Sequence, residues 1–374
     1  MLENSGKIKV LISCGSYSWG GLEIIALQSA LKLSNLGHEI KLACAKNSKL
    51  ESEAKLNALN TIPVFSKDIK LVSSIIKLKK LIGKFSPDVI HTHLSHDLWT
   101  IVPALKLSGS NAKLFLTKHM ASGVKKNEFF HKYLYKRVNK IFAISNYIRQ
   151  SVLNTCPVSE ENVLLLPDGI DLQRFNENKY IPSIAKKQLQ LPEDKVIIGI
   201  IGRMTPGKGH EEFLCAAKIV NENYRGKAFY LVVGSASYGE DEYETKIRNL
   251  VKALNLGNIL FTGYRKDTPR ILSAIDILAF PSHNESFGIT LLEAMAMGLP
   301  VVASGNAGIL DIVVNNETGL LVEPKNSVEL ADGIIKLIND ENLREKLGKA
   351  GRKRVEQKFD FNVITNKLGE YYTK

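Results

Sequence analysis

Two cations and two glycines lie close together in the second half of the chain, at Gly202-Arg203 and Lys208-Gly209. They follow an apolar run over 196–201 and precede a helical pattern over 211–220. Glycines let the backbone approach a ligand, a helix N-terminus offers free N–H groups, and the cations neutralise negative charge. The segment therefore suits a diphosphate, although a basic strand-to-helix turn without a ligand has the same composition. It is not a P-loop, because no Ser or Thr follows Lys208-Gly209.

Two glutamates, Glu285 and Glu293, follow another apolar run over 277–280. We expect Glu285 in a loop and Glu293 on a helix that begins near Phe287 or Gly288. Carboxylates at such a place accept charge-assisted hydrogen bonds from the hydroxyls of a sugar or a ribose. Spacing alone favours a simpler interpretation, a pair of glutamates on a helix surface, because eight residues are a little over two helical turns.

The elements that must position these residues alternate between apolar runs and helical patterns. In the first half, a glycine loop with Gly20 and Gly21 separates the first run from a helical pattern over 22–36. The predicted strands span 7–13, 38–43, 88–91, 113–117, 140–144 and 163–166, then 196–201, 228–233, 259–262, 277–280, 300–303 and 319–322. This alternation predicts an α/β fold with two Rossmann-like parallel sheets, which bind ligands at the carboxyl ends of their strands.

Length and composition predict two domains. A chain of 374 residues exceeds one ordinary core, and the polar stretch 176–194 carries Pro182 and Pro192. We therefore predict an N-terminal domain over 1–175, a linker over 176–194 and a C-terminal domain over 195–359. No run approaches the roughly 18 apolar residues of a membrane span, and no early apolar segment resembles a secretory signal, so we expect a cytoplasmic protein.

The positive charge is concentrated in the first half of the chain. Of the net charge of +12, residues 1–175 carry +11, from 24 Lys and Arg against 13 Asp and Glu. An anionic partner such as a membrane surface, a phosphorylated lipid or a nucleic acid fits this asymmetry, and a solvated basic surface fits it equally. Two segments combine cations with apolar or aromatic residues: 67–84, which has the pattern of a basic amphipathic helix, and 118–140.

The motifs taken together resemble the retaining glycosyltransferases of family four. The resemblance is carried by the Gly202–Gly209 segment, by Pro281-Ser282, by the run from Glu285-Ser-Phe-Gly through Glu293-Ala-Met-Ala-Met-Gly to Ala303, and by residues 308–322. It is looser in the first half, where Gly20-Gly21-Leu-Glu, residues 88–93, Ser145 and 167–171 agree. The family's usual Asn-Gly turn is Asp168-Gly169 here, a conservative change because Asp adopts the same turn.

This resemblance implies a GT-B architecture with two facing Rossmann-like domains, an active site between them and a last helix, over 360–374, that packs back on the first domain. It implies that Arg203 and Lys208 bind the donor diphosphate, that Glu285 lies at the donor sugar and that Glu293 binds the ribose. The remaining donor-site positions are Gly20, Gly21, Gly202, Phe287 and Gly288. His119 matches a histidine that family members place near the sugar and acceptor, although a lone histidine after a strand is more often structural.

The resemblance also implies a reaction and its substrates. Relatives retain the anomeric configuration without a protein nucleophile, and the leaving phosphate helps to deprotonate the acceptor. We expect a UDP-hexose or UDP-N-acetylhexosamine first and GDP-mannose second, with a saccharide or lipid-linked acceptor in surface polysaccharide, lipopolysaccharide or glycolipid synthesis.

No cofactor and no metal are expected, because the sequence has no Asp-x-Asp motif and the acidic run at Glu240 is placed in a loop beside Gly239. Three other classes compete with this interpretation. A sugar-nucleotide epimerase can use a similar fold, but the glutamate motif argues against it. A dehydrogenase is disfavoured because 15–21 is not G-x-G-x-x-G. A nonenzymatic module that binds membranes or nucleic acid would explain the basic half but not the motifs of the other half, so no nucleic-acid partner is expected.

Overall fold

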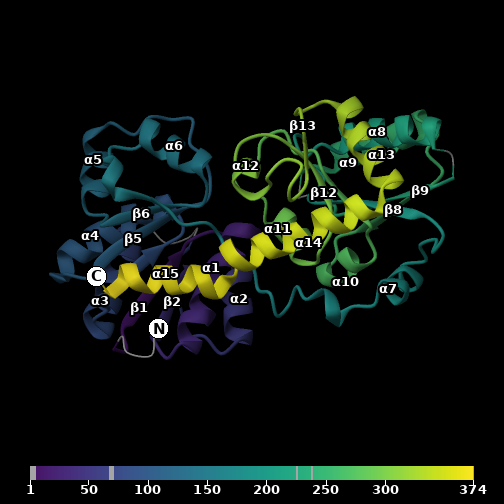
Figure 1. Ribbon diagram of the computed structural model, residues 1–374. Helices are drawn as coiled ribbons and strands as arrows, with labels where there is room; N and C mark the ends of the chain where they lie inside the picture. The colour runs from purple at the N-terminus through teal and green to yellow at the C-terminus, as the bar shows by residue number, and fades with distance from the viewer. Residues whose placement is uncertain (1–5, 67–70, 225, 237–238, 374) are drawn as a thin grey trace. The chain divides into compact units, whose positions relative to one another are not determined.

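The computed structural model describes residues 6–66, 71–224, 226–236 and 239–373. The chain divides into two compact units: unit 1 comprises Met1–Gly169 and Asn362–Lys374, and unit 2 comprises Ile170–Phe361. Each unit has its own parallel sheet with helices between successive strands (Figure 1). The predicted fold class, α/β with two Rossmann-like sheets, is therefore confirmed.

Unit 1 is built on a sheet with the strand order β3-β2-β1-β4-β5-β6-β7, in which every recorded pairing is parallel. The strands are β1 (Lys9–Cys14), β2 (Glu39–Ala45), β3 (Thr61–Phe65), β4 (Val89–Thr92), β5 (Lys113–Lys118), β6 (Lys140–Ala143) and β7 (Val163–Leu165). Strand β1 is buried along five of its six residues, as expected where helices cover both faces of a parallel sheet.

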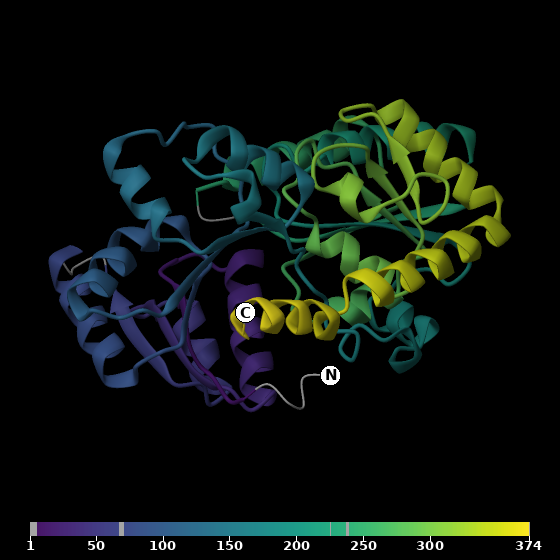
Figure 2. The ribbon, with the colours of Figure 1, turned by 60° about the vertical axis from the view of Figure 1, so that its left-hand side comes forward.

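The helices of unit 1 include one from the far end of the sequence. They are α1 (Gly21–Asn35), α2 (Lys49–Leu56), α3 (Leu71–Phe85), α4 (Leu98–Ser108), α5 (Phe129–Lys136), α6 (Asn146–Thr155) and α15 (Phe361–Thr373). Ile364, Leu368 and Tyr372 of α15 join one core cluster with residues of α1, α2 and the sheet. The yellow α15 accordingly lies beside the purple α1 (Figure 2).

Unit 2 repeats this plan with the strand order β10-β9-β8-β11-β12-β13, again all parallel. Its strands are β8 (Val196–Ile201), β9 (Ala228–Val233), β10 (Ile259–Gly263), β11 (Ile277–Phe280), β12 (Val301–Ser304) and β13 (Leu320–Val322). Its helices are α7 (Pro182–Gln188), α8 (His210–Asn223), α9 (Asp241–Ala253), α10 (Thr268–Ser273), α11 (Ile289–Ala296), α12 (Ile309–Ile312), α13 (Ser327–Asn339) and α14 (Glu341–Lys358).

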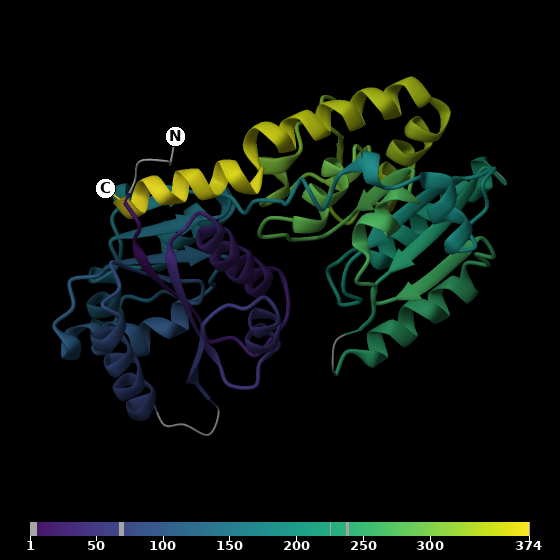
Figure 3. The same cartoon turned by 90° about the horizontal axis from the view of Figure 1, so that it is seen from below.

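The two faces of the second sheet carry different helices. Helices α8, α9 and α13 contribute to one core cluster with residues of β8, β9 and β11. The long yellow α14 of unit 2 in Figure 3 packs against α11, which carries Glu293.

In both sheets the strand order reverses between the first strand and the fourth, at β1/β4 in unit 1 and β8/β11 in unit 2. Such a switch point leaves a crevice at the carboxyl ends of the strands, where doubly wound sheets bind ligands. The motifs at Gly202–Gly209 and at Glu285 follow β8 and β11, so both are located at the switch point of unit 2.

Four features differ from the sequence-based predictions. Strand β3 was not predicted, the unit boundary lies at Gly169 rather than at residue 175, and the predicted linker belongs to unit 2, where α7 packs against α10. The acidic run was wrongly placed in a loop: Asp241 and Glu242 open α9 and Glu240 is its N-cap residue, where carboxylates stabilise the helix dipole.

Within the ranges that the structure describes, no helix is both long and apolar enough to cross a membrane.

Candidate functional site

Unit 2 brings the loop after β8 and the loop after β11 into direct backbone contact. Strands β8 and β11 pair in register, with Ile277 opposite Ile198. Beyond the strands, the His283 N–H donates a hydrogen bond of 2.8 Å to the carbonyl oxygen of Gly207. The start of α8 and the Glu285 loop are thereby held side by side.

Gly209 makes this approach possible. It has φ +81°, and a Cβ atom at this position would lie 2.2 Å from the carbonyl oxygen of Pro281. Only glycine tolerates both the left-handed backbone and the missing space. The glycine of the motif is thus explained by packing between the two loops as well as by access for a ligand.

Replacing Gly209 with alanine should therefore destabilise unit 2. We expect a loss of about 3 kcal/mol or more from the left-handed backbone and the overpacking together, or roughly 6–12 °C in melting temperature. Gly207→Ala is the matched control, because Gly207 has φ +86° and open space around a Cβ atom. It should lose only about 1–2 kcal/mol. Equal losses in the two variants, measured by thermal denaturation, would contradict the packing role of Gly209.

The ammonium group of Lys208 forms an ion pair with the carboxylate of Glu285, with Nζ 2.5 Å from Oε2. The hydroxyl of Ser282 also donates to this oxygen, at 3.4 Å. The two side chains are 29% and 18% exposed, so the pair is accessible to a ligand. The structure thus joins two residues that are 77 positions apart in sequence.

Arg203 follows β8 and Gly202, and its side chain is exposed. Among the described residues no carboxylate pairs with it. The N–H of Gly202 donates to the carbonyl oxygen of Val233 at 3.0 Å, which fixes the backbone at the end of the strand. An exposed guanidinium group without a carboxylate partner among the described residues, at the same edge of the sheet as an ion pair that a ligand can reach, suits an anionic ligand with several charges.

Glu293 lies in the first two turns of α11 and is half-buried. Burial raises the pKa of Glu293 to about 7, and the positive charge of Arg174 opposes this rise. A carboxyl group that titrates near neutral pH in a partly closed site is a candidate for ligand recognition.

Helix α11 begins at Ile289, one residue later than predicted, and its N-cap residue Gly288 has φ +111°. The side chain of Phe287 is 2% exposed and makes an edge-to-face contact with Phe359, with centroids 5.9 Å apart. Phe287 therefore anchors the loop by packing. Its buried ring is therefore not available to a ligand, and the donor-binding role of Phe287 and Gly288 stays a prediction that depends on backbone N–H groups at the start of the helix.

A second pair of side chains links the first turn of α8 to the loop after β11 and was not predicted from sequence. Nε2 of His283 lies 2.8 Å from Oε1 of Glu212, and the amide of Asn306 donates to the carbonyl oxygens of Ser282 and His283. The other oxygen of Glu212 is buried without a hydrogen-bond partner in the described structure. These contacts brace the loop that carries Glu285.

In unit 1, the glycine loop after β1 leads into α1. The N–H of Gly20 donates to Oε2 of Glu23 at 2.8 Å, which caps the helix that begins at Gly21. Asp97 fixes the start of the loop by accepting hydrogen bonds from the Ser13 hydroxyl at 2.7 Å and the Gly15 N–H at 2.9 Å. Burial raises the pKa of Asp97 to about 7, although these hydrogen bonds lower it.

His119 follows β5 and is buried, and protein groups face both of its ring nitrogens. Nδ1 lies 3.5 Å from Oδ2 of Asp168, and Nε2 lies 3.1 Å from Nδ1 of His93. Because a carboxylate only accepts, we assign the Nδ1 proton to His119, whose Nε2 then accepts from His93. Its expected role at the sugar stays a prediction.

His93 and His91 extend this cluster inward. Their rings stack with centroids 4.6 Å apart, and His91 contacts the Tyr372 hydroxyl at 2.6 Å and the Thr117 hydroxyl at 2.7 Å. Burial lowers the pKa of His91 to about 3 and that of His93 well below its usual value. Nε2 of His93 is buried with no partner in the described part of the chain. The neutral rings connect the carboxyl edge of the sheet to α15.

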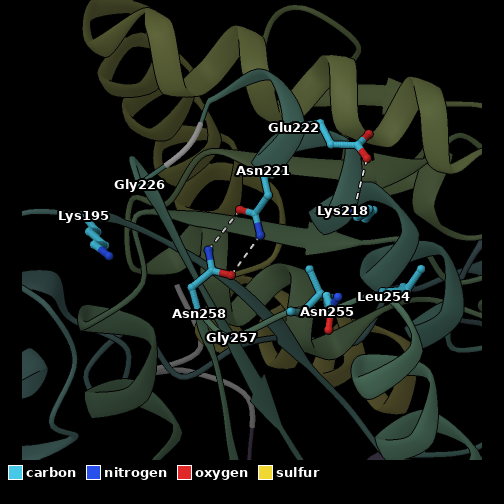
Figure 4. A pocket seen from close by; sticks show the side chains of 10 residues that line it. Lys195, Lys218, Asn221, Glu222, Gly226, Leu254, Asn255, Gly257 and Asn258 are labelled. Atoms are coloured by element: carbon cyan, nitrogen blue, oxygen red, sulfur yellow. Dashed lines mark hydrogen bonds and ion pairs between the residues drawn. The ribbon is translucent and has the colours of Figure 1, made fainter.

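A separate pocket of about 460 Å³ lies in unit 2 beside the ends of α8 and α9. The amides of Asn221 and Asn258 form two reciprocal hydrogen bonds there (Figure 4). Helices in a parallel sheet run opposite to the strands, so this pocket lies at the amino edge, away from Arg203 and Glu285. Groups of three or more residues that could hold a metal ion are absent from the described residues.

Two family models match consecutive parts of the sequence. The model described as "Glycosyl transferases group 1" matches residues 183–354, and "Glycosyltransferase Family 4" matches residues 19–174. The first match contains the whole Arg203, Lys208, Glu285 and Glu293 constellation. The chain belongs to the group 1 glycosyltransferases.

Two relatives agree with this assignment. The capsular polysaccharide biosynthesis glycosyltransferase CapM of Staphylococcus aureus is 32% identical over 265 residues, 67% of this chain and 66% of the relative. The UDP-Gal:alpha-D-GlcNAc-diphosphoundecaprenol alpha-1,3-galactosyltransferase of Escherichia coli is 25% identical over 94% of this chain and 93% of its own length.

The Rickettsia africae ESF-5 glycosyltransferase has a TM-score of 0.88 at 25% identity, covering 98% of each chain. Anabaena HepE in complex with UDP and glucose has a TM-score of 0.84 at 20% identity, covering 98% of this chain and 100% of its own, which supports the fold alone. This group 1 glycosyltransferase therefore uses nucleotide sugars and has the fold of GT-B enzymes.

Proposed function

We propose that this glycosyltransferase moves a hexosyl or N-acetylhexosaminyl group from a UDP-sugar, with GDP-mannose as second choice, and retains the anomeric configuration. The observation that carries the proposal is the pair of accessible cations that follow β8 at the switch point of unit 2, namely the exposed Arg203 and the partly exposed Lys208, which forms an ion pair with Glu285. The choice of UDP is supported by the E. coli relative, whose name specifies UDP-Gal.

In the proposed reaction, the bond between C1 of the sugar and the diphosphate oxygen breaks while the acceptor oxygen bonds to C1 on the same face. The acceptor proton passes to the leaving diphosphate. Arg203, Lys208 and the N–H groups at the start of α11 stabilise the negative charge that develops on the diphosphate. Glu285 binds sugar hydroxyls once the donor has drawn Lys208 away from it, and Glu293 binds the ribose.

We propose that the diphosphate needs no metal ion, because two side-chain cations supply the charge that a divalent ion provides in other transferases. Gly20 and Gly21 are proposed to approach the donor phosphates, and His119 the sugar and acceptor. The acceptor is a saccharide or a lipid-linked saccharide of surface polysaccharide, lipopolysaccharide or glycolipid synthesis. The names of CapM and of the E. coli galactosyltransferase support this choice. We place the enzyme in the cytoplasm, with unit 1 in peripheral contact with the inner face of the membrane.

The experiment that tests this function is thermal stabilisation by a panel of UDP- and GDP-sugars in the presence of a chelator. A ligand that binds only the folded protein raises its melting temperature, by about 2.7 kcal/mol of stability at 100 times its dissociation constant. Selective stabilisation by a UDP-sugar supports the proposal. Stabilisation only after metal is restored would refute metal independence, and a changed sugar nucleotide in the absence of acceptor would indicate an epimerase.

The raised pKa of Glu293 predicts a pH-dependent donor affinity. Only the ionised carboxylate is a strong acceptor for ribose hydroxyls, and with a pKa of about 7 it is mostly protonated below that pH. The dissociation constant for a UDP-sugar, whose phosphates do not titrate in this range, should therefore be about 10-fold higher at pH 6 than at pH 8, measured by calorimetry. Glu293→Gln should bind weakly at both pH values. A variant that kept the pH dependence would exclude Glu293 as its cause.

A further inference from the structure

Helices α4 and α5 of unit 1 enclose a second pocket, of about 520 Å³. Its walls include Val102, Leu105 and Lys106 of α4 and Tyr133, Lys136 and Arg137 of α5 and its C-cap. The wall of the pocket therefore combines apolar side chains, an aromatic ring and three cations. The pocket is distinct from the carboxyl edge, because it lies at the C-terminal ends of both helices.

The cations of this pocket are not balanced by a carboxylate of the described residues. No acidic side chain is among the described residues that line the pocket, and no ion pair joins Lys106, Lys136 or Arg137 to another described residue. The guanidinium group of Arg137 donates to the carbonyl oxygen of Ala112 at 2.7 Å, which fixes its position. Nζ of Lys106 lies 5.6 Å from the centre of the Tyr133 ring. Three cations around one partly apolar hollow attract a phosphate group.

Large apolar side chains continue from this pocket along the same pair of helices. Phe129 is 77% exposed and Phe130 is 62% exposed. The rings of Phe130 and Trp99 lie 6.3 Å apart, which links α5 to α4 again. The exposure of two adjacent phenylalanine rings to water is unfavourable. Aromatic and basic side chains on one surface suit the interface of an anionic bilayer.

Helix α3 is the other basic amphipathic segment and differs in one respect. Its exposed apolar residues, Leu71, Val72 and Ile76, are aliphatic, and its buried face is directed to the core. Lys67–Lys70, the start of the predicted amphipathic segment, lies outside the described residues. Exposed aromatic residues and a cationic pocket occur together only at α4–α5 of these two segments. We therefore favour the α4–α5 surface over α3 as the site of membrane contact.

We propose that the α4–α5 pocket binds the phosphate of an anionic phospholipid headgroup while Phe129 and Phe130 enter the bilayer interface. This inference rests on the proposed membrane contact of unit 1 and assigns it to one surface. The surface does not include Arg203 or Glu285. If the membrane proposal is wrong, the proposed donor binding is therefore unaffected.

The test is co-sedimentation of the full chain with phosphatidylcholine vesicles, with and without phosphatidylglycerol. Each lysine near such a surface contributes about 1 kcal/mol, so Lys106→Gln with Lys136→Gln should weaken binding about 30-fold. Lys79→Gln with Lys80→Gln on α3 removes the same charge and should weaken binding less than about 3-fold, because neither lysine lines the pocket. All variants should keep their stabilisation by donor, which shows that they are folded.

Two further measurements separate the bilayer from a soluble phosphate. Phe129→Ser with Phe130→Ser should weaken vesicle binding even at high salt, because the variant loses apolar contact with the bilayer, which salt does not screen. Glycerol 1-phosphate should not release the protein from vesicles at millimolar concentration. The proposal is overturned if the α3 variant loses binding instead, if neutral vesicles bind equally well, or if glycerol 1-phosphate competes.

Discussion

Replacing Arg203 with alanine is expected to lower turnover by about 10²- to 10³-fold, the usual cost of removing one group that stabilises charge in a transition state. Arg203 is exposed and has no carboxylate partner in the described structure, so the change should leave the melting temperature nearly unaltered. The measurement is the rate of nucleoside diphosphate release at saturating donor. Stabilisation by UDP should also fall, because the guanidinium group is proposed to contact the diphosphate before the reaction.

Two controls make this result specific. Arg270→Ala removes another exposed arginine of unit 2, on α10, and should leave turnover unchanged. Arg203→Lys keeps the charge but loses the planar fork of donors, so it should recover only part of the activity. Turnover in Arg203→Ala within a few-fold of the native rate would exclude Arg203 from the proposed diphosphate site.

Replacing Glu285 with glutamine is expected to change nucleotide binding and turnover in opposite directions. In the free protein, Glu285 competes with a diphosphate for the ammonium group of Lys208. Glu285→Gln removes this competition, so UDP should bind about 3- to 10-fold more tightly, equivalent to about 1 kcal/mol for a partly exposed pair. Turnover should fall about 100-fold or more, because the carboxylate is proposed to hold the sugar.

The partner variant tests the same ion pair from the other side. Lys208→Ala should weaken UDP binding about 10- to 100-fold, since a hydrogen bond to a charged group contributes about 1.5–3 kcal/mol. In the double variant the tighter binding caused by Glu285→Gln should disappear, because Lys208 is no longer there to be released. Calorimetric titration with UDP measures all four proteins. Weaker UDP binding in Glu285→Gln alone would refute the competition.

The alternation of apolar runs and helical patterns was sufficient to predict the two sheets, and most strands of unit 2 begin and end within one residue of the prediction. Strand β3 was missed because Pro63 breaks its pattern, yet a proline is tolerated there because β3 is an edge strand. In the sequence Pro182 indicates a linker, whereas in the structure it occupies the first turn of α7, where proline suits a helix.

Part of the candidate site could be predicted from the sequence and part could not. The shared edge of adjacent parallel strands was enough to place Lys208 and Glu285 together, since their loops follow neighbouring strands. The brace between Glu212 and His283 could not be foreseen, because it depends on side chains from separate elements. The spacing of His91 and His93 is sufficient to predict that their side chains meet. Residues two apart in a strand share one face, and in the structure the two rings stack.

The position of α15 determines the order in which the two units can mature on the ribosome. Unit 1 begins the chain, but Ile364, Leu368 and Tyr372 supply part of its core, and the Tyr372 hydroxyl is bonded to the buried His91. All of unit 2 is translated before those residues emerge. The unit that is synthesised first is thus completed last, and until then the apolar side chains that pack against α15 stay exposed, where a chaperone can bind them.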